Sequence, residues 1–265
     1  MAAVGEGQIT YDARGLAEPH AEAPHTAEID GSRAAFDAHD LSTRQINLEL
    51  RRLLYEEGVT DVTVRNPGAK HSLGVGILTR CRITFEGSLG YFGCGLVDGP
   101  EIHITGRVGW SACENMMSGV VVVEGNAGSL TGAALRGGDL VVKGRVGARM
   151  GIDMKGGTII VGGRAGAFCG FMMQRGRMVI LGDAGKNLGD SMYDGTIYVG
   201  GKIAGLGVDA VPSEMTDLDV HWLERKLKLY GLEAPKGVKN MKKITAGRQL
   251  WNYDNLEPAE KKLIL

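Results

Sequence analysis

A pattern of 19 residues repeats without a gap. The units begin at Glu101, Val120, Asp139, Thr158 and Arg177. Glycine occupies the sixth, the ninth and the last residue of each unit, so the 42 glycines of the chain are not scattered. The three columns are Gly106, Gly125, Gly144, Gly163 and Gly182; Gly109, Gly128, Gly147, Gly166 and Gly185; and Gly119, Gly138, Gly157, Gly176 and Gly195. A fixed period of this length is typical of proteins in which each repeat packs against its two neighbours.

Each unit opens with a short β-branched run, such as VVVVEG or TIIVGG, and closes with glycines. The runs are too short for a helix and predict strands, while the glycines permit positive φ or close contact between backbones. The second and fourth residues of every full unit are apolar, and alternate residues of a strand lie on one face, so these positions predict the core. They are Ile102 and Ile104, Val121 and Val123, Leu140 and Val142, Ile159 and Val161, and Met178 and Ile180.

The sixteenth position is a column of methionine and leucine. We expect a ladder of flexible apolar side chains inside the fold, and a methionine cofactor site is the alternative. The column consists of Met116, Leu135, Met154, Met173 and Met192.

One unit cannot bury both faces of its strand, so neighbouring units must stack at about 4.8 Å per coil. The leucine-rich repeat signature is absent, and the period of 19 is not a multiple of the six that left-handed hexapeptide helices require. The sequence therefore predicts an all-β fold, a right-handed parallel β-helix with glycine-rich coils. The pattern continues backwards through Gly87 and Gly90 and places Gly68 at the sixth position, so the array covers roughly residues 62–211.

Two amphipathic helices are predicted beside the array, and we expect them to cover the open strand edges at its ends. The first lies in residues 41–58, where Ser42 and Gln45 form a capping box and Gly58 ends the helix. The second begins at Thr216. The chain then divides into an extended N-terminal arm (1–40), a capping helix (41–58), the parallel β-helix (59–211), and a C-terminal helix with a docking tail (212–265).

Neither terminal segment is expected to form a core of its own. Residues 1–40 are acidic, and residues 232–265 are mildly basic. Trp251 and Tyr253 in the second segment favour ordering on a neighbouring protein over disorder.

The charge balance gives no general attraction to nucleic acids or membranes, because the net charge is -1. Neither a secretory leader nor a run of 18 apolar residues is found, so export and membrane spanning are not expected. The cysteines lack CxxC spacing and are expected to be free thiols in a reducing, cytoplasmic compartment. They are Cys81, Cys94, Cys113 and Cys169.

Few residues have a spacing that suggests chemistry. Cys94 and Cys113 share one repeat position and should lie on adjacent coils, where we interpret them as small buried residues. A redox pair or half of a metal site is the alternative. His20 and His25 lie in the N-terminal arm, with a metal role as the alternative to a solvated position.

Two charged groups are candidates for an exposed catalytic face of the kind that parallel β-helix enzymes such as pectate lyases use. A solvated face explains both groups. The sequence therefore predicts no catalytic, cofactor-binding or metal-binding residue in this chain. The groups are Asp183, Asp190 and Asp194 with Lys186 and Asn187 between them in one coil, and Arg107, Arg145 and Arg164 at the seventh position of three coils.

The segments FEGSLGYFGCGL (85–96) and GNAGSLTGAALRGGDLVV (125–142), with the coils that follow, resemble the GXGXG domain at the end of the large subunit of glutamate synthase. The resemblance covers residues 42 to about 211. It implies a right-handed β-helix without catalytic residues, which in that family braces a glutaminase-like domain against an FMN-containing synthase barrel, between which ammonia passes. Formylmethanofuran dehydrogenase carries a similar subunit.

The stretch STRQINLELRRLLYEEGVTDVTVRNPGAKHSLGVG is similar to the separate β-helix subunit of N-methylglutamate synthases, which exchange methylamine with the amino group of glutamate and release ammonia. The resemblance implies a docking subunit of a large hetero-oligomer. Its partners would be a glutaminase-like subunit and a subunit holding FMN and iron–sulfur clusters, with no cofactor in this chain. A subunit of a split glutamate synthase is the alternative, and a carbohydrate-active β-helix enzyme is the alternative from another class.

Overall fold

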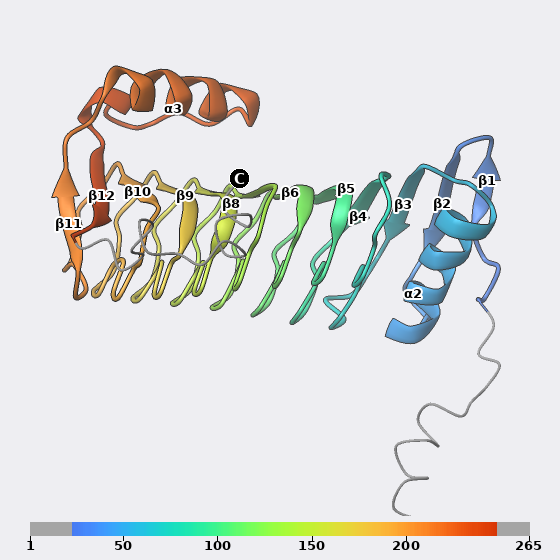
Figure 1. The fold of residues 1–265 in the computed structure, drawn as a ribbon. Helices are drawn as coiled ribbons and strands as arrows, with labels where there is room; N and C mark the ends of the chain where they lie inside the picture. The colour runs from blue at the N-terminus through green and yellow to red at the C-terminus, as the bar shows by residue number, and fades with distance from the viewer. Residues whose placement is uncertain (1–22, 248–265) are drawn as a thin grey trace, which may run out of the picture.

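In a computed structural model, residues 23–247 are described, and they form one parallel β-solenoid of about seven turns (Figure 1). From β4 (Arg82–Glu86) to β10 (Thr196–Val199), each strand pairs in parallel with the next. Apart from register shifts after Asp98 and Lys155, paired residues are one sequence repeat apart, as Ile83 and Ile102 are. The pairing register equals the sequence period, so the predicted parallel β-helix is confirmed. Between them lie β5 (Asp98–Ile104), β6 (Ser118–Val123), β7 (Asp139–Val142), β8 (Lys155–Val161) and β9 (Arg175–Ile180).

The core lies inside the coils, where the repeat pattern predicts it. The second and fourth residues of the units are buried, and all belong to one continuous hydrophobic cluster. The column at the sixteenth position is fully buried in the same cluster, as Met154 illustrates, so the predicted internal ladder is confirmed. Stacked coils therefore share one core, and a coil cannot be removed without exposing its neighbours.

The solenoid begins earlier than the sequence predicts. β2 (Arg33–Asp37) pairs in parallel with β3 (Asp61–Arg65), and β1 (Glu28–Asp30) adds to β2 in the antiparallel direction. Ala34 and Phe36 of β2 are buried in the main core. The expectation of an extended arm over residues 1–40 is therefore wrong for the part of that segment that the structure describes.

The first regular coil is longer than the others. The offset between β3 and β4 exceeds the repeat period by two positions and places Arg65 opposite Glu86. The predicted sixth position at Gly68 is therefore wrong, because the residue after Arg65 is Asn66. Asn66 adopts a φ of 53°, a left-handed conformation that asparagine tolerates better than most residues.

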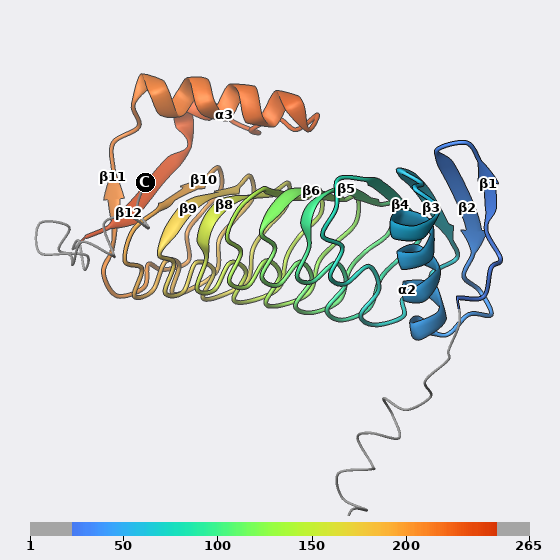
Figure 2. The same cartoon turned by 45° about the vertical axis from the view of Figure 1, so that its right-hand side comes forward.

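The helix α2 (Thr43–Arg51) begins at the predicted capping box, in which the Gln45 N–H donates to Ser42 Oγ and the Ser42 N–H donates to Gln45 Oε1. A short π-helix, η1 (Arg52–Glu56), continues it towards Gly58. The helix lies at the N-terminal end of the solenoid (Figure 2). The apolar stripe of α2 is buried in the main core through Ile46 and Leu50, and Leu53 of η1 extends it.

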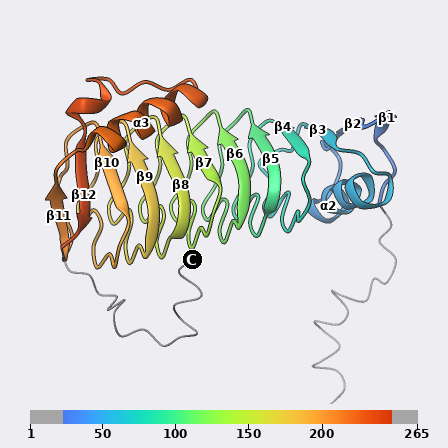
Figure 3. The same cartoon turned by 45° about the horizontal axis from the view of Figure 1, so that its top comes forward.

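The helix α3 (Asp217–Leu229) starts after Thr216 as predicted, but it does not cover a strand edge. It lies over the outer face of the sheet, above the C-terminal strands (Figure 3). Leu223 and Leu227 pack there against the third residues of four coils and form a second core. Those third residues are Val141, Ile160, Val179 and Tyr198.

The strand edge at the C-terminal end is closed by the chain that follows α3. A 3₁₀ turn, η2 (Val238–Asn240), leads into β12 (Lys242–Ala246), which inserts antiparallel between β10 and β11 (Ala210–Ser213). Residues 242–246 therefore belong to the fold and not to a docking tail. The edge strand β11 carries Pro212, which has no N–H to offer to a further strand. Trp251 and Tyr253 lie outside the described residues.

Asp219 joins α3 to two strands of the sheet. Its carboxylate accepts hydrogen bonds from the Tyr198 hydroxyl of β10 (2.5 Å) and from the Lys243 ammonium of β12 (2.8 Å). Burial opposes the charge on this carboxylate, but the hydrogen bonds from Lys243, Tyr198 and Thr216 outweigh burial and hold the pKa of Asp219 well below its usual range. The ionised carboxylate is therefore the form that fastens α3.

Replacing Asp219 with asparagine should loosen α3, because the charge-assisted bond to Lys243 is lost. We expect the free energy of unfolding to fall by about 1.5–3 kcal/mol, and amide hydrogen exchange in α3 to accelerate. The control is Asp217→Asn, an exposed acid in the same turn, which should change stability by less than about 0.5 kcal/mol. Equal effects of the two substitutions would contradict this role of Asp219.

A membrane-crossing helix is not found between residues 23 and 247, since neither α2 nor α3 has the length and apolar character of a bilayer span.

Candidate docking groove

A groove of about 820 Å³ follows one corner of the coils and is lined by equivalent positions of successive repeats. Arg107, Arg145 and Arg164, the three arginines at the seventh position, line it together with an aromatic cluster at one end. We call this surface the arginine groove. Its aromatic cluster consists of His71, Tyr91 and Trp110.

The seventh position holds residues of two kinds, those that bind backbone groups and those that extend into solvent. The Asn126 side-chain carbonyl accepts a hydrogen bond from the Arg145 N–H (3.0 Å), and Ser88 Oγ accepts one from the Arg107 N–H (3.1 Å). Short polar residues at this position therefore join one coil to the next. The three arginine side chains are not used in this way and are exposed.

The floor of the groove is made of backbone, because the ninth residue of each coil is glycine. A Cβ atom on Gly128 would lie 2.7 Å from the carbonyl oxygen of Gly109 and 2.5 Å from Cδ1 of Trp110. Real Cβ atoms do not approach so closely, so a side chain here would force the coils apart. The glycine column thus leaves only backbone at the ninth position of the groove.

The aromatic cluster is a stack on three successive coils. The ring centroids of His71 and Tyr91 lie 4.6 Å apart, and those of Tyr91 and Trp110 lie 5.7 Å apart. Trp110 is 56% exposed, which is unusual for a residue of its size. This cluster was not predicted from the sequence, although Tyr91 and Trp110 are one repeat apart and share the tenth position of their coils.

The charge of the groove has one sign. Its lining contains three arginines and a histidine, and neither aspartate nor glutamate. Among residues 23–247, no ion pair joins Arg107, Arg145 or Arg164 to a carboxylate. The sequence interpretation of these arginines as a solvated face agrees with their exposure, and the structure adds that they line a common concave surface.

Cys94 and Cys113 lie at equivalent positions of adjacent coils, as expected, and both are fully buried free thiols. Burial raises the pKa of Cys94 to about 12, and burial together with the neighbouring Cys94 raises the pKa of Cys113 well above its ordinary value. Both thiols therefore stay protonated near neutral pH, whereas a good nucleophile or metal ligand must be a thiolate. The interpretation as small buried residues is the one that the geometry favours.

The candidate aspartates of the coil that contains β9 accept hydrogen bonds from an adjacent residue or from the next coil. Asp183 accepts a hydrogen bond from the Lys202 N–H, Asp190 from the Ser191 hydroxyl, and Asp194 from the Gly195 N–H. The described residues contain no group of three carboxylate, thiol or imidazole side chains that could hold a metal ion. Lys186 is exposed, and Asn187 adopts a φ of 57° in the turn between them.

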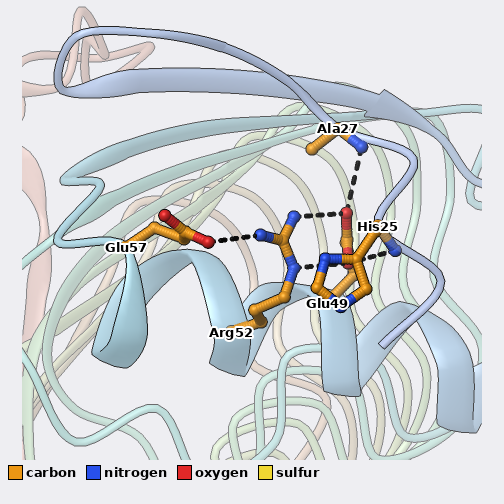
Figure 4. Close-up of polar contacts among 5 residues, drawn as sticks. All are labelled: His25, Ala27, Glu49, Arg52 and Glu57. Atoms are coloured by element: carbon orange, nitrogen blue, oxygen red, sulfur yellow. Dashed lines mark hydrogen bonds and ion pairs between the residues drawn. The ribbon is translucent and has the colours of Figure 1, made fainter. Parts of the chain in front are cut away.

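His25 contacts the N-terminal helix through its backbone N–H, and His20 lies outside the described residues. The His25 and Ala27 N–H groups donate to the Glu49 carboxylate, which also forms an ion pair with Arg52 at 2.9 Å (Figure 4). Glu49 is fully buried and Arg52 is 5% exposed. Burial opposes ionisation of Glu49, but the bonds from Arg52, Ala27 and His25 outweigh it and lower its pKa.

This buried ion pair was not predicted from the sequence. The spacing in the sequence is consistent with such a pair, since Glu49 and Arg52 are three residues apart and adjoin the apolar residues Leu50 and Leu53. The pair fixes the segment that leads into β1 against α2. It is a structural contact, and it lies apart from the arginine groove, whose lining it does not share.

The stacked coils, shared core and concave arginine groove define a repeat scaffold of the solenoid class. Residues 76–220 match the GXGXG motif family, which is more than half of the chain, so the chain belongs to that family. The family is associated with glutamate synthase-like proteins. The family resemblance seen in the sequence is thereby confirmed at this level. A search of curated proteins gives no significant match.

Proposed function

We propose that this chain is the β-helix subunit of N-methylglutamate synthase, where it acts as a non-catalytic scaffold. The complex would convert methylamine and L-glutamate to N-methyl-L-glutamate and ammonia. The observation that carries the proposal is membership of the GXGXG motif family over residues 76–220. The fold supports it, because a ladder of coils with a fixed register is a stiff support on which two partner subunits can be held at a constant separation.

The proposed partners are a glutaminase-like subunit and a subunit that holds FMN and iron–sulfur clusters. An iron–sulfur cluster is held by several thiolates at one place. The cysteines of this chain do not fit that need, because the two on adjacent coils are fully buried protonated thiols, and Cys81 and Cys169 lie on other coils. We therefore assign the redox groups to the partner subunit and no reaction step to residues of this chain.

Coexpression of this chain with the two partner subunits tests the proposal. We expect a stable complex that is purified through a tag on this chain, shows the visible absorbance of flavin and iron–sulfur clusters, and forms N-methylglutamate from methylamine and glutamate. The chain alone should be colourless and inactive. A stoichiometric flavin or transferase activity in the purified single chain would overturn the scaffold assignment.

A subunit of a split glutamate synthase is the second candidate, and the same family association favours it. The substrates distinguish the two. A complex that uses glutamine and 2-oxoglutarate, and that forms no N-methylglutamate when methylamine is supplied, would replace the first assignment by the second. The scaffold role of the chain is common to both.

A further inference from the structure

We infer that the arginine groove is the docking site for an extended acidic segment of a partner subunit, in which an aromatic or large apolar side chain lies next to the carboxylates. The identity of the partner rests on the proposed function. The chemistry of the groove follows from the residues that line it and is independent of that function.

The charge of the groove selects an anionic occupant. Arg107, Arg145 and Arg164 are exposed, none forms an ion pair with a carboxylate of residues 23–247, and no acidic residue lines the groove. Arginine presents a planar fork of donors that matches a carboxylate in two parallel hydrogen bonds. Three such forks on one surface, in a chain of net charge -1, are a local feature and not part of a general basic field.

The spacing of the arginines fits an extended chain. Adjacent coils of a parallel β-helix lie about 4.8 Å apart, so Arg145 and Arg164 are separated by about 5 Å along the axis, and Arg107 and Arg145 by about 10 Å. An extended peptide advances about 3.3 Å per residue and places alternate side chains on one side. A segment of about five residues therefore spans the three arginines, and its carboxylates can reach them through the flexible arginine stems.

Two further features match a polypeptide. Trp110 lies in the same coil as Arg107 and is 56% exposed, so it offers an aromatic surface beside the first positive charge. Exposed tryptophan and arginine are the residues that most often anchor protein interfaces. The ninth residue of each coil is glycine, as at Gly166, so the groove has only backbone at this position and a bound backbone can approach it closely.

A nucleic acid fits the same surface less well. Proteins that bind single strands combine aromatic stacking with a basic groove that follows many phosphates. This groove has only three arginines, and Asp183, the next residue at the seventh position, lies outside its lining. A polypeptide with a few carboxylates matches both the number of positive charges and the length of the groove.

The first test measures binding of fluorescein-labelled peptides to the full chain by fluorescence anisotropy. The probes are an acidic peptide of repeating Glu-Glu-Tyr, a basic peptide of repeating Lys-Lys-Tyr and an oligothymidylate. We expect the acidic peptide to bind, and the double variant Arg145→Glu/Arg164→Glu to weaken its binding by about tenfold or more. Added salt should weaken wild-type binding, because exposed charges are screened.

Arg136→Glu is the matched control. Arg136 is also exposed and lies in the same array, but it does not line the groove. This variant should bind the acidic peptide within about twofold of the wild type, and thermal denaturation should show that both variants remain folded. Binding of the oligothymidylate but not the acidic peptide would overturn the inference in favour of a nucleic acid. The inference would also be overturned if neither the acidic peptide nor the oligothymidylate bound, or if the double variant and Arg136→Glu lost affinity for the acidic peptide equally.

The second test identifies the occupant in the assembled complex. A photocrosslinking residue is introduced as Trp110→p-benzoylphenylalanine, and as Met117→p-benzoylphenylalanine for a control on another corner of the same coil, where Met117 is 45% exposed. We expect the photocrosslinking residue at position 110 to crosslink to an acidic segment of a partner subunit, as mapped by mass spectrometry. Crosslinks to residues 1–22 or 248–265 of this chain, to a second copy, or to no acidic segment would contradict the inference.

The two tests separate this inference from the proposed function. If the acidic peptide binds and the double variant loses it, but no complex forms with the two partner subunits, the groove assignment stands and the proposed complex is wrong. If the complex forms equally well with Arg145→Glu/Arg164→Glu, the scaffold role stands and the groove assignment is wrong.

Discussion

Replacing Glu49 with alanine should lower the free energy of unfolding by about 3–5 kcal/mol. The fully buried carboxylate forms the ion pair with Arg52 and accepts the His25 and Ala27 N–H groups. Without it, the Arg52 guanidinium would remain at 5% exposure with only Glu57 as a partner, and two backbone donors would lose their acceptor. Chemical denaturation monitored by circular dichroism measures the change.

The matched control is Glu57→Ala, which removes the other carboxylate that contacts Arg52. The Glu57 side chain is 46% exposed, so its loss should cost less than about 1 kcal/mol. A Glu49→Ala variant that is no less stable than Glu57→Ala would show that the buried pair contributes nothing beyond a surface contact.

The ion pair also predicts a pH dependence. The pKa of Glu49 is lower in the folded protein than the ordinary glutamate value, so its contribution to stability is fully present above that ordinary value of about 4.3. It is lost as the pH falls towards the lowered pKa of the folded state. The difference in stability between the wild type and Glu49→Gln should therefore shrink in acid, as denaturation at a series of pH values would measure.

Replacing Gly119 with alanine should destabilise the fold by about 2–5 kcal/mol. A left-handed conformation costs an L-residue about 1–2 kcal/mol, and crowding in a packed structure adds about 1–3 kcal/mol. Gly119 has a φ of +100°, and a Cβ atom there would lie 2.3 Å from the Pro100 carbonyl oxygen of the preceding coil. That oxygen belongs to the backbone and cannot rotate away as a side chain would.

Gly205→Ala is the control for this prediction, because a Cβ atom on Gly205 would have no heavy atom within 4 Å and its φ is not positive. It should change stability by less than about 0.5 kcal/mol. Thermal and chemical denaturation of both variants decide the matter. A Gly119→Ala protein as stable as Gly205→Ala would mean that the coils can separate at this corner at little cost.

The repeat could be predicted from the sequence because each coil sees the same surroundings. Val121 and Val123 alternate in one strand and recur as Leu140 and Val142 in the next, so local pattern and stacking require the same register. The capping box at Ser42 was equally local, since all of its groups lie within one helical turn. In such positions, a short stretch of sequence contains all of the interacting groups.

The errors fall where distant segments meet. The third residues of the coils change from Thr84 and His103 to Val141 and Ile160 along the array, which is a sequence sign of a cover over the later coils. The pattern identifies the covered face but not α3 as the segment that covers it. The pairing of β2 with β3 was missed because the whole of α2 and η1 separates the paired positions, as Arg33 and Asp61 show.

Only the charged residues of the arginine groove could be predicted from the sequence, and not its concave shape. Its charged wall was recognised as a column of arginines, but the concavity depends on the glycine floor and on the stack of Tyr91 and Trp110 on neighbouring coils. Side chains of one repeat position form a single column, whereas the groove is lined by several neighbouring columns, from the seventh to the tenth position. That relation follows from how the chain turns, which the period alone does not specify.

The insertion of β12 has a consequence for synthesis on the ribosome. β10 can pair with β9 as soon as it emerges, but its other edge waits for β12, as the pairing of Thr196 with Thr245 shows. Until that late segment is translated, the nascent protein carries an open β-edge of the kind that recruits other chains. Chains truncated before residue 242 would therefore keep an unpaired strand edge on β10, which β12 covers in this chain.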